Sequence, residues 1–182
     1  TYIWDFGDGT SGSGASVQHS YSGQGSYTAT VTVTDGDGGS ASASTSVTVS
    51  NGDPIISNLV GDTAGAEGQA LSWTAVATDP GNDPLTYTWT FGDGSAPVSS
   101  SLPVANHTYV NEGSYQVQVV VSDGDGGSAT SIMTVTVSNA APLVSNLTGT
   151  TSGLEGGTYT YSVQAADPGS GDVLSYSWNF GD

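Results

Sequence analysis

One short motif occurs three times in the chain and constrains the fold more than any other feature of the sequence. It stands at 4–9 as Trp-Asp-Phe-Gly-Asp-Gly, at 89–94 as Trp-Thr-Phe-Gly-Asp-Gly, and at 178–182 as Trp-Asn-Phe-Gly-Asp. A Trp and a Phe two positions apart point to the same face of a strand, and the Gly-Asp-Gly that follows favours a turn with positive φ. We therefore predict an internal repeat in which each unit anchors a strand in a core and then turns.

A constant offset of 88 residues relates the rest of the repeat. It joins the following pairs: Asp35 and Asp123, Pro54 and Pro142, Glu67 and Glu155, and Asp79 and Asp167. The second copy of the motif also has three extra residues in the loop at 95–106. A loop that changes length while the element spacing is kept is typical of a tandem domain array.

Strict alternation of residue types marks the strands. In 26–50, Tyr27, Ala29, Val31 and Val33 alternate with hydroxylated residues, which predicts a half-buried strand that turns into a hairpin. Residues 114–138 repeat this pattern. Across the central unit we predict strands near 55–60, 69–78, 84–91, 97–101, 103–109, 114–122 and 128–138.

These short strands are separated by clusters of Gly, Pro, Asn and Asp, and no segment has a convincing helical pattern. About seven short strands with a central Trp predict an all-β fold, a two-sheet antiparallel sandwich of the immunoglobulin-like type. A small barrel is the alternative that the pattern leaves open.

The same residues carry a family resemblance. Trp-x-Phe-Gly-Asp-Gly is followed by His19-x-Tyr21 or His107-x-Tyr109, and then by Gly-Ser-Tyr and a Val-rich strand that ends in Asp. This combination resembles the polycystic-kidney-disease (PKD) domain over the whole chain. The resemblance implies tandem immunoglobulin-like (PKD-type) antiparallel β-sandwiches in extracellular proteins, such as cell-surface stalks, adhesins, and secreted proteases and polysaccharide hydrolases. It implies nothing catalytic in the domain itself.

The repeat divides the chain into one full unit and two partial units. We predict the C-terminal part of a PKD-like domain at 1–51, a complete domain at 52–139, and the N-terminal part of a third at 140–182. Each half domain alone would expose strand edges and half a core, so neighbouring repeats of the same chain or identical copies are expected to complete it. The linkers at 49–54 and 137–142 are short and contain proline, which predicts a rod of successive domains.

Composition excludes several classes of partner. The chain has no Lys or Arg and a formal net charge of −17, which excludes binding to nucleic acid through phosphate neutralisation. No apolar run approaches the roughly 18 residues that cross a bilayer, so no membrane insertion is expected in this segment. The absence of Cys removes disulfides and thiolate ligands. Solvent, mobile cations or bound metal must balance the carboxylates, so calcium is the one cofactor to consider.

Asn51, Asp79, Asp83 and Asp123 are the candidate calcium ligands. They are expected to lie in separate loops near the entrance of the complete domain, and oxygen ligands from separate loops suit calcium. The family resemblance also implies calcium near the domain junction in some members. The two Asp-Gly-Asp-Gly turns resemble the start of an EF-hand loop, but they lack the Glu at its twelfth position, which favours simple hairpin turns.

The histidines do not indicate catalysis. His19 and His107 occupy equivalent positions, and neither has a second His or a Cys in its unit with which to bind zinc. We therefore expect each to make a hydrogen bond at a strand end. No nucleophile motif and no carboxyl in an apolar pocket can be recognised, so the chain is not expected to be an enzyme.

Two further residue types bear on recognition. Trp73 alternates with Leu71 and Ala75, which predicts a core position, whereas an exposed Trp73 would indicate a platform for a sugar or peptide. We expect the three Trp residues of the repeated motif to lie in cores as well. Asn106 and Asn146 match the glycosylation acceptor pattern.

Two functions fit these observations. The first is a non-catalytic structural repeat of an extracellular, cell-surface stalk, adhesin or filament, in contact with glycans or matrix. The alternative is an accessory polysaccharide- or protein-binding module of a secreted hydrolase. Flanking sequence discriminates between them, because further repeats favour the first function and a catalytic domain favours the second.

Overall fold

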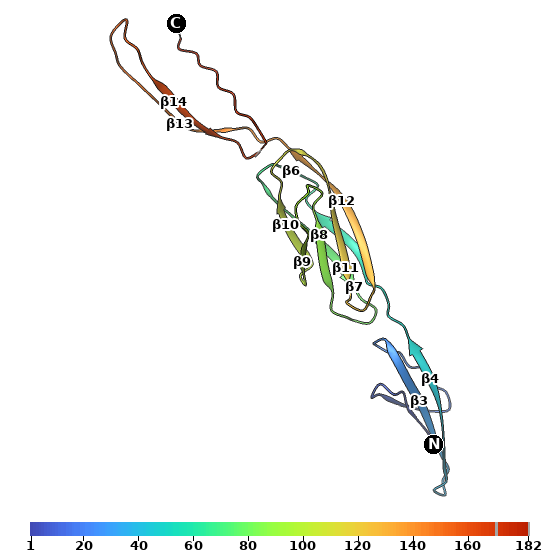
Figure 1. Cartoon of the computed structure of the whole chain (residues 1–182). Coiled ribbons are helices and arrows are strands. Elements are labelled where there is room, and N and C mark those ends of the chain that lie inside the picture. Colours follow the sequence, from blue (N-terminus) through green and yellow to red (C-terminus); the bar gives the residue numbers. More distant parts are fainter. Residues whose placement is uncertain (170, 182) are drawn as a thin grey trace.

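The computed structural model describes residues 1–169 and 171–181. Within these residues it has fourteen strands in four sheets and no helix, which confirms the all-β prediction. Figure 1 shows three units that follow one another along the chain. We call them the N-terminal segment (1–51), the middle domain (52–139) and the C-terminal segment (140–182).

The N-terminal segment is one antiparallel sheet in the order β2-β1-β3-β4. Its strands are β1 (Tyr2–Asp5), β2 (Ser11–Ser13), β3 (Gly25–Thr34) and β4 (Ser40–Val49). The β3–β4 hairpin pairs Tyr27 with Val47, as the alternation in 26–50 predicts. Phe6 and Ala29 are buried, whereas the apolar side chain of Ile3 is largely exposed.

The middle domain is a sandwich of two sheets with the strand orders β10-β7-β5 and β6-β12-β11-β8-β9. Its strands are β5 (Ile55–Gly61), β6 (Ala64–Ala66), β7 (Ala70–Thr78), β8 (Thr86–Thr90), β9 (Val98–Ser100), β10 (Val104–Thr108), β11 (Gly113–Ser122) and β12 (Ser128–Ser138). Because the two sheets are separate, they confirm the predicted sandwich and exclude the alternative of a small barrel. All pairs are antiparallel except β6 with β12, which is parallel.

The core lies between these two sheets. On β11, Val117, Val119 and Val121 are buried while the residues between them face outward, because successive side chains point to opposite faces of a strand. Trp73 from one sheet and Phe91 from the end of β8 meet across the core, with ring centroids 5.8 Å apart. The fully buried large side chains are Trp73, Trp89, Tyr109, Phe91, Leu71, Val117, Val119, Val121 and Val135.

The C-terminal segment has a two-stranded antiparallel sheet of β13 (Leu143–Gly149) and β14 (Tyr161–Ala166). These strands correspond to β5 and β7, and a register irregularity between Val144 and Asn146 matches the one between Ile56 and Asn58 in β5. The local backbone geometry therefore repeats together with the sequence.

One core prediction was wrong. Trp178 is 42% exposed, although its counterpart Trp89 is 0% exposed. Trp89 lies on β8 and pairs with Val119 of β11, whereas no strand in the described part of the C-terminal segment includes Trp178. Trp4 is only half-buried in its single sheet, so the core prediction holds fully for Trp89.

Candidate functional site

The turn after β8 explains the glycines of the repeated motif. Gly92 and Gly94 have φ values of +79° and +85°, in the region that favours glycine. A Cβ added to Gly92 would lie 2.8 Å from the carbonyl oxygen of Gln116 on β11, while one added to Gly94 would meet nothing within 4 Å. Gly92 therefore also allows the turn to pack closely on the neighbouring strand.

Asp93, between these glycines, joins the motif to the His-x-Tyr pair. Its Oδ1 accepts hydrogen bonds from the Ser95 amide (3.0 Å) and hydroxyl (2.6 Å), and its Oδ2 lies 2.7 Å from His107 Nε2. Burial acts to raise the pKa of Asp93, but the hydrogen bonds from Ser95 and His107 outweigh it and lower the pKa below the ordinary carboxyl value.

Aromatic contacts complete this cluster. The His107 ring stacks on Phe91 with centroids 4.1 Å apart, and the Tyr109 hydroxyl donates to the Phe91 carbonyl oxygen at 2.9 Å. Tyr109 in turn stacks on Tyr115 at 4.3 Å. Three sequence motifs, at 89–94, 107–109 and 113–115, therefore form one packed unit, which connects the end of β8 to β10 and β11.

The N-terminal segment repeats this arrangement. His19 Nε2 lies 2.6 Å from Asp8 Oδ2, and the Tyr21 hydroxyl donates to the Phe6 carbonyl oxygen at 3.0 Å. The hydroxyl of Thr10 is the largest cause of a lowered Asp8 pKa, which is about 2. The predicted strand-end hydrogen bond is confirmed for His107 on β10, and His19 makes the equivalent bond from the loop between β2 and β3.

This His–Asp pair is built as a structural contact. One face of His107 is covered by Phe91, and the nearby hydroxyl of Ser95 points its proton at the Asp93 carboxylate. In an acyl-transfer site the serine would instead be hydrogen-bonded to the histidine. The geometry therefore stabilises the turn and does not activate a nucleophile.

The four predicted calcium ligands gather at one end of the middle domain as two pairs. Asn51 Nδ2 donates to Asp123 Oδ2 at 2.7 Å, and Asp123 Oδ1 accepts the amides of Asp125 and Gly127 that close its hairpin turn. Asp123 is buried, and the amides of its own turn already occupy one of its carboxylate oxygens. For Asn51 to bind a cation through its oxygen, its amide would have to turn over.

Asp79 and Asp83 form the second pair. Asp79 Oδ1 accepts the amides of Gly81 and Asp83, while its Oδ2 is buried without a hydrogen-bond partner. Burial is the largest cause of a raised Asp83 pKa, followed by the negative charges of Asp79, Asp125 and Asp123. The carboxylate oxygens of the three Asp residues are hard ligands that fit calcium. Binding by Asn51, Asp79, Asp83 and Asp123 stays a prediction.

The other sequence-based candidates have clear locations. Trp73 is 1% exposed and its Nε1 donates to the Asp62 carbonyl oxygen at 2.9 Å, so the core prediction is confirmed and the aromatic platform is excluded. Asn106 on β10 and Asn146 on β13 are both exposed. Glycosylation of these two asparagines stays a prediction.

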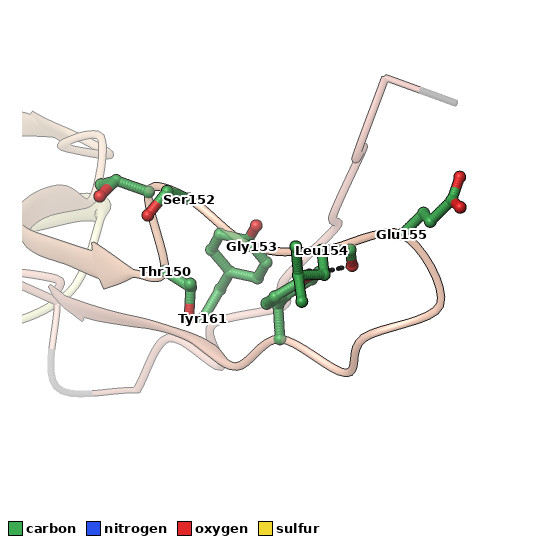
Figure 2. Close-up of a pocket in the computed structure, with 8 residues that line it drawn as sticks. Thr150, Ser152, Gly153, Leu154, Glu155 and Tyr161 are labelled. Atoms are coloured by element: carbon green, nitrogen blue, oxygen red, sulfur yellow. Dashed lines mark hydrogen bonds between the residues drawn. The ribbon is translucent and has the colours of Figure 1, made fainter.

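A hollow of about 370 Å³ lies in the loop between β13 and β14. Hydroxyl groups of Thr150 and Ser152 contribute to its lining, and Figure 2 shows the single carboxylate, Glu155, pointing away from them. The Tyr159 hydroxyl, which also belongs to the lining, donates to the Leu154 carbonyl oxygen. This hollow brings together no set of acid, base and nucleophile.

Two facing, mainly antiparallel sheets of short strands, with aromatic residues packed between them, define an immunoglobulin-like β-sandwich protein. The sequence then identifies the family. The family model of the PKD domain matches residues 1–49 and 51–137, and the chain belongs to the PKD-domain family.

Similar proteins include large enzymes. The chain is 36% identical over 118 residues to "Chitinase A" of Pseudoalteromonas piscicida, which covers 62% of this chain and 14% of that protein. It is 34% identical over 91 residues to "Microbial collagenase" of Vibrio alginolyticus, covering 50% of this chain and 11% of the collagenase. The chain therefore spans only a small part of each of these relatives.

A solved structure is also similar. It is the "PKD domain of M14-like peptidase from Thermoplasmatales archaeon SCGC AB-540-F20", at 30% identity and a TM-score of 0.42, covering 48% of this chain and 98% of that one. Among the residues that the structure describes, no helix is long and apolar enough to cross a membrane.

Proposed function

We propose that this chain is a non-catalytic accessory module of a secreted, extracellular hydrolase, in which tandem PKD domains contact polysaccharide or protein. The observation that carries the proposal is that the chain matches 14% of the length of a chitinase and 11% of the length of a collagenase. A PKD segment is thus a minor part of proteins whose names state a hydrolytic activity. The structural clusters around Asp8 and Asp93 support a non-catalytic role, since each serves to hold a turn.

The outer face of the five-stranded sheet is the surface best suited to such contacts. Thr88, Gln118 and Thr134 point outward from β8, β11 and β12, on the face opposite the buried valines. Hydroxyls and amides on a flat sheet can hydrogen-bond to sugar hydroxyls or peptide groups. Because the chain has no Lys or Arg and a charge of −17, neutral polysaccharides suit this face better than anionic ones.

Sedimentation with insoluble chitin and with collagen fibrils tests the proposal. The full chain is expected to sediment with at least one of them, and the double variant Gln118→Ala, Thr134→Ala is expected to bind several-fold more weakly. Thr78→Ala, on the outer face of the other sheet, is the matched control and should bind like the unchanged chain. A chain that stays in the supernatant with both substrates, or that loses binding equally in the control, contradicts the proposal.

A second candidate is the rod of a cell-surface stalk or filament. It is favoured by the short linkers and by the succession of units in Figure 1. Exposed apolar side chains in the N-terminal and C-terminal segments, such as Ile3 and Leu143, would then be covered by neighbouring repeats or by identical copies. Electron microscopy of the purified chain tests this candidate, because fibres support it and dispersed monomers oppose it.

A further inference from the structure

The linker between β4 and β5 contains the one Asn-Gly pair of the chain, Asn51 and Gly52. Both residues are half-buried and lie outside any strand. A glycine directly after an asparagine has chemical consequences, because it has no Cβ to keep its amide nitrogen away from the asparagine side chain. Such a pair can close into a ring far more readily than asparagine followed by a larger residue.

Packing explains why a glycine stands at position 52. A Cβ added to Gly52 would lie 3.1 Å from Cγ and 3.2 Å from Cβ of Pro80, which is closer than ordinary van der Waals contact. A larger residue would therefore have to displace the Pro80 ring. The close approach of the linker to the middle domain thus leaves Asn51 beside its most reactive type of neighbour.

The reacting groups of this pair are accessible. The Gly52 amide donates to no acceptor among the residues that the structure describes, so its nitrogen is not held in place by a hydrogen bond. A hollow of about 220 Å³ borders both Asn51 and Gly52, with Tyr21 and Pro80 also in its lining. Water can therefore reach the pair.

The equivalent linker after β12 holds the same groups in place. Asn139 is the 88-residue counterpart of Asn51, but it is followed by Ala140, whose amide donates to Glu67 Oε1 at 2.8 Å. When the Asn139 side chain is turned so that its nitrogen donates, that nitrogen lies 2.7 Å from the same oxygen. Glu67 thus restrains both the side chain and the following amide in this linker.

We propose that Asn51 is a site of spontaneous deamidation, which changes the junction between the N-terminal segment and the middle domain as the protein ages. The Gly52 nitrogen attacks the side-chain carbonyl carbon of Asn51 and forms a C–N bond. The side-chain nitrogen leaves as ammonia, with the proton that the Gly52 nitrogen loses. Water then opens the resulting succinimide ring at either carbonyl and gives aspartate or isoaspartate at position 51.

The nitrogen that leaves is the atom that now ties the linker to the middle domain. Asn51 Nδ2 donates to Asp123 Oδ2 at 2.7 Å, and Asp123 is buried. A carboxylate in its place would face a second carboxylate, and like charges this close repel each other. With no Lys or Arg in the chain, no side chain of those types balances the added charge. In the isoaspartate product the side-chain methylene also enters the main chain and lengthens the linker.

Mass spectrometry of the ageing chain tests the reaction. The full chain is incubated in mildly alkaline buffer with EDTA, and chymotryptic peptides are followed for the gain of one dalton that replacement of NH₂ by OH produces. Asn51 is expected to convert at least ten times faster than Asn139. Gly52→Ala is expected to slow the conversion of Asn51 at least tenfold, because its Cβ hinders attack by the amide nitrogen. Equal rates at Asn51 and Asn139 in the folded chain overturn the proposal.

The variant Ala140→Gly separates the effect of the sequence from that of the structure. It gives the second linker an Asn-Gly pair, but Glu67 still holds the following amide. Asn139 in this variant is therefore expected to react more slowly than Asn51 in the folded chain, and at the same rate as Asn51 in urea. If Asn139 matches Asn51 in the folded variant as well, the unrestrained amide of Gly52 is not what selects the site, and that part of the proposal is overturned.

The change at the junction has its own readout. Because the chain has no Cys, spin labels can be placed at Ser46→Cys in β4 and Thr134→Cys in β12, which are equivalent exposed positions of the two units. The distance distribution is expected to broaden as the chain ages, and Asn51→Asp is expected to reproduce the broadening in fresh protein. Asn139→Asp, which adds the same charge to the other linker, is the matched control and should leave the distribution unchanged. Coinciding distributions for the two variants overturn the effect on the junction.

Discussion

Replacing Gly92 by Ala tests why the repeated motif contains its first glycine. The residue has a φ of +79°, and a left-handed conformation costs a residue with a Cβ about 1–2 kcal/mol. The added methyl would also lie 2.8 Å from the carbonyl oxygen and 2.9 Å from the nitrogen of Gln116, and forcing such a contact costs about 1–3 kcal/mol more. The expected loss in free energy of unfolding is therefore about 2–5 kcal/mol.

Gly94→Ala provides the matched comparison. Its φ of +85° is almost the same, but an added Cβ would meet nothing within 4 Å. Only the conformational cost of about 1–2 kcal/mol is expected. The difference between the two variants thus isolates the close approach of the turn to β11.

Equilibrium unfolding in urea, followed by Trp fluorescence of the full chain, measures both variants. Trp73 and Trp89 are fully buried in the middle domain and dominate the change in signal, because Trp4 and Trp178 are already partly exposed. Equal losses for Gly92→Ala and Gly94→Ala, or a larger loss for Gly94→Ala, would refute the reasoning. The backbone of β11 would then not be what requires the first glycine.

Four further predictions follow from the described contacts. Trp73→Ala empties the centre of the core and is expected to cost about 3–5 kcal/mol in urea unfolding. The Asp8 pKa of about 2 implies a stabilisation that is present above about pH 4 and lost as the pH falls toward 2, so thermal melts of Asp8→Asn should depend less on pH in this range. Burial raises the pKa of Tyr109 to about 12, so its stabilisation is present below about pH 10 and lost as the pH rises toward 12; Tyr109→Phe should flatten that alkaline decline in Tm. If calcium occupies the predicted site at Asp79, EDTA should lower the Tm of the unchanged chain more than that of Asp79→Asn.

The sequence predicts most strands of the middle domain because apolar and polar residues alternate strongly along them. Val117, Val119 and Val121 mark β11 unambiguously, and the glycines around Asp93 mark the turn after β8. Strand β6 was missed, because Ala64–Ala66 contains no large apolar residue and its only signal is a parallel pairing with β12 that is distant in sequence. Burial of Trp178 was wrongly predicted because burial depends on neighbouring strands and not on the motif itself.

The candidate sites were predictable to different extents. The spacing of polar residues at strand ends was enough to group Asp79, Asp83 and Asp123 at one end of the sandwich. The proximity of the carboxylates of Glu67, Asp167 and Asp172 was not predicted, although the offset of 88 residues relates Glu67 to Glu155. A repeat offset pairs equivalent residues of different units, whereas this group joins non-equivalent residues across a junction, and only the three-dimensional arrangement shows that.

The pairing of β6 with β12 has a mechanical consequence. The middle domain receives the chain at β5 and releases it at the end of β12, where Ala64, Gly65 and Ala66 pair in parallel with Thr136, Val137 and Ser138. Tension applied through the two linkers would pull β6 and β12 in opposite directions along their lengths. Their hydrogen bonds would then carry the load together in shear, and would not open one after another as in an unzipping hairpin. This short strand would therefore add a mechanical barrier to extension of the domain, beside the pairing of β5 with β7.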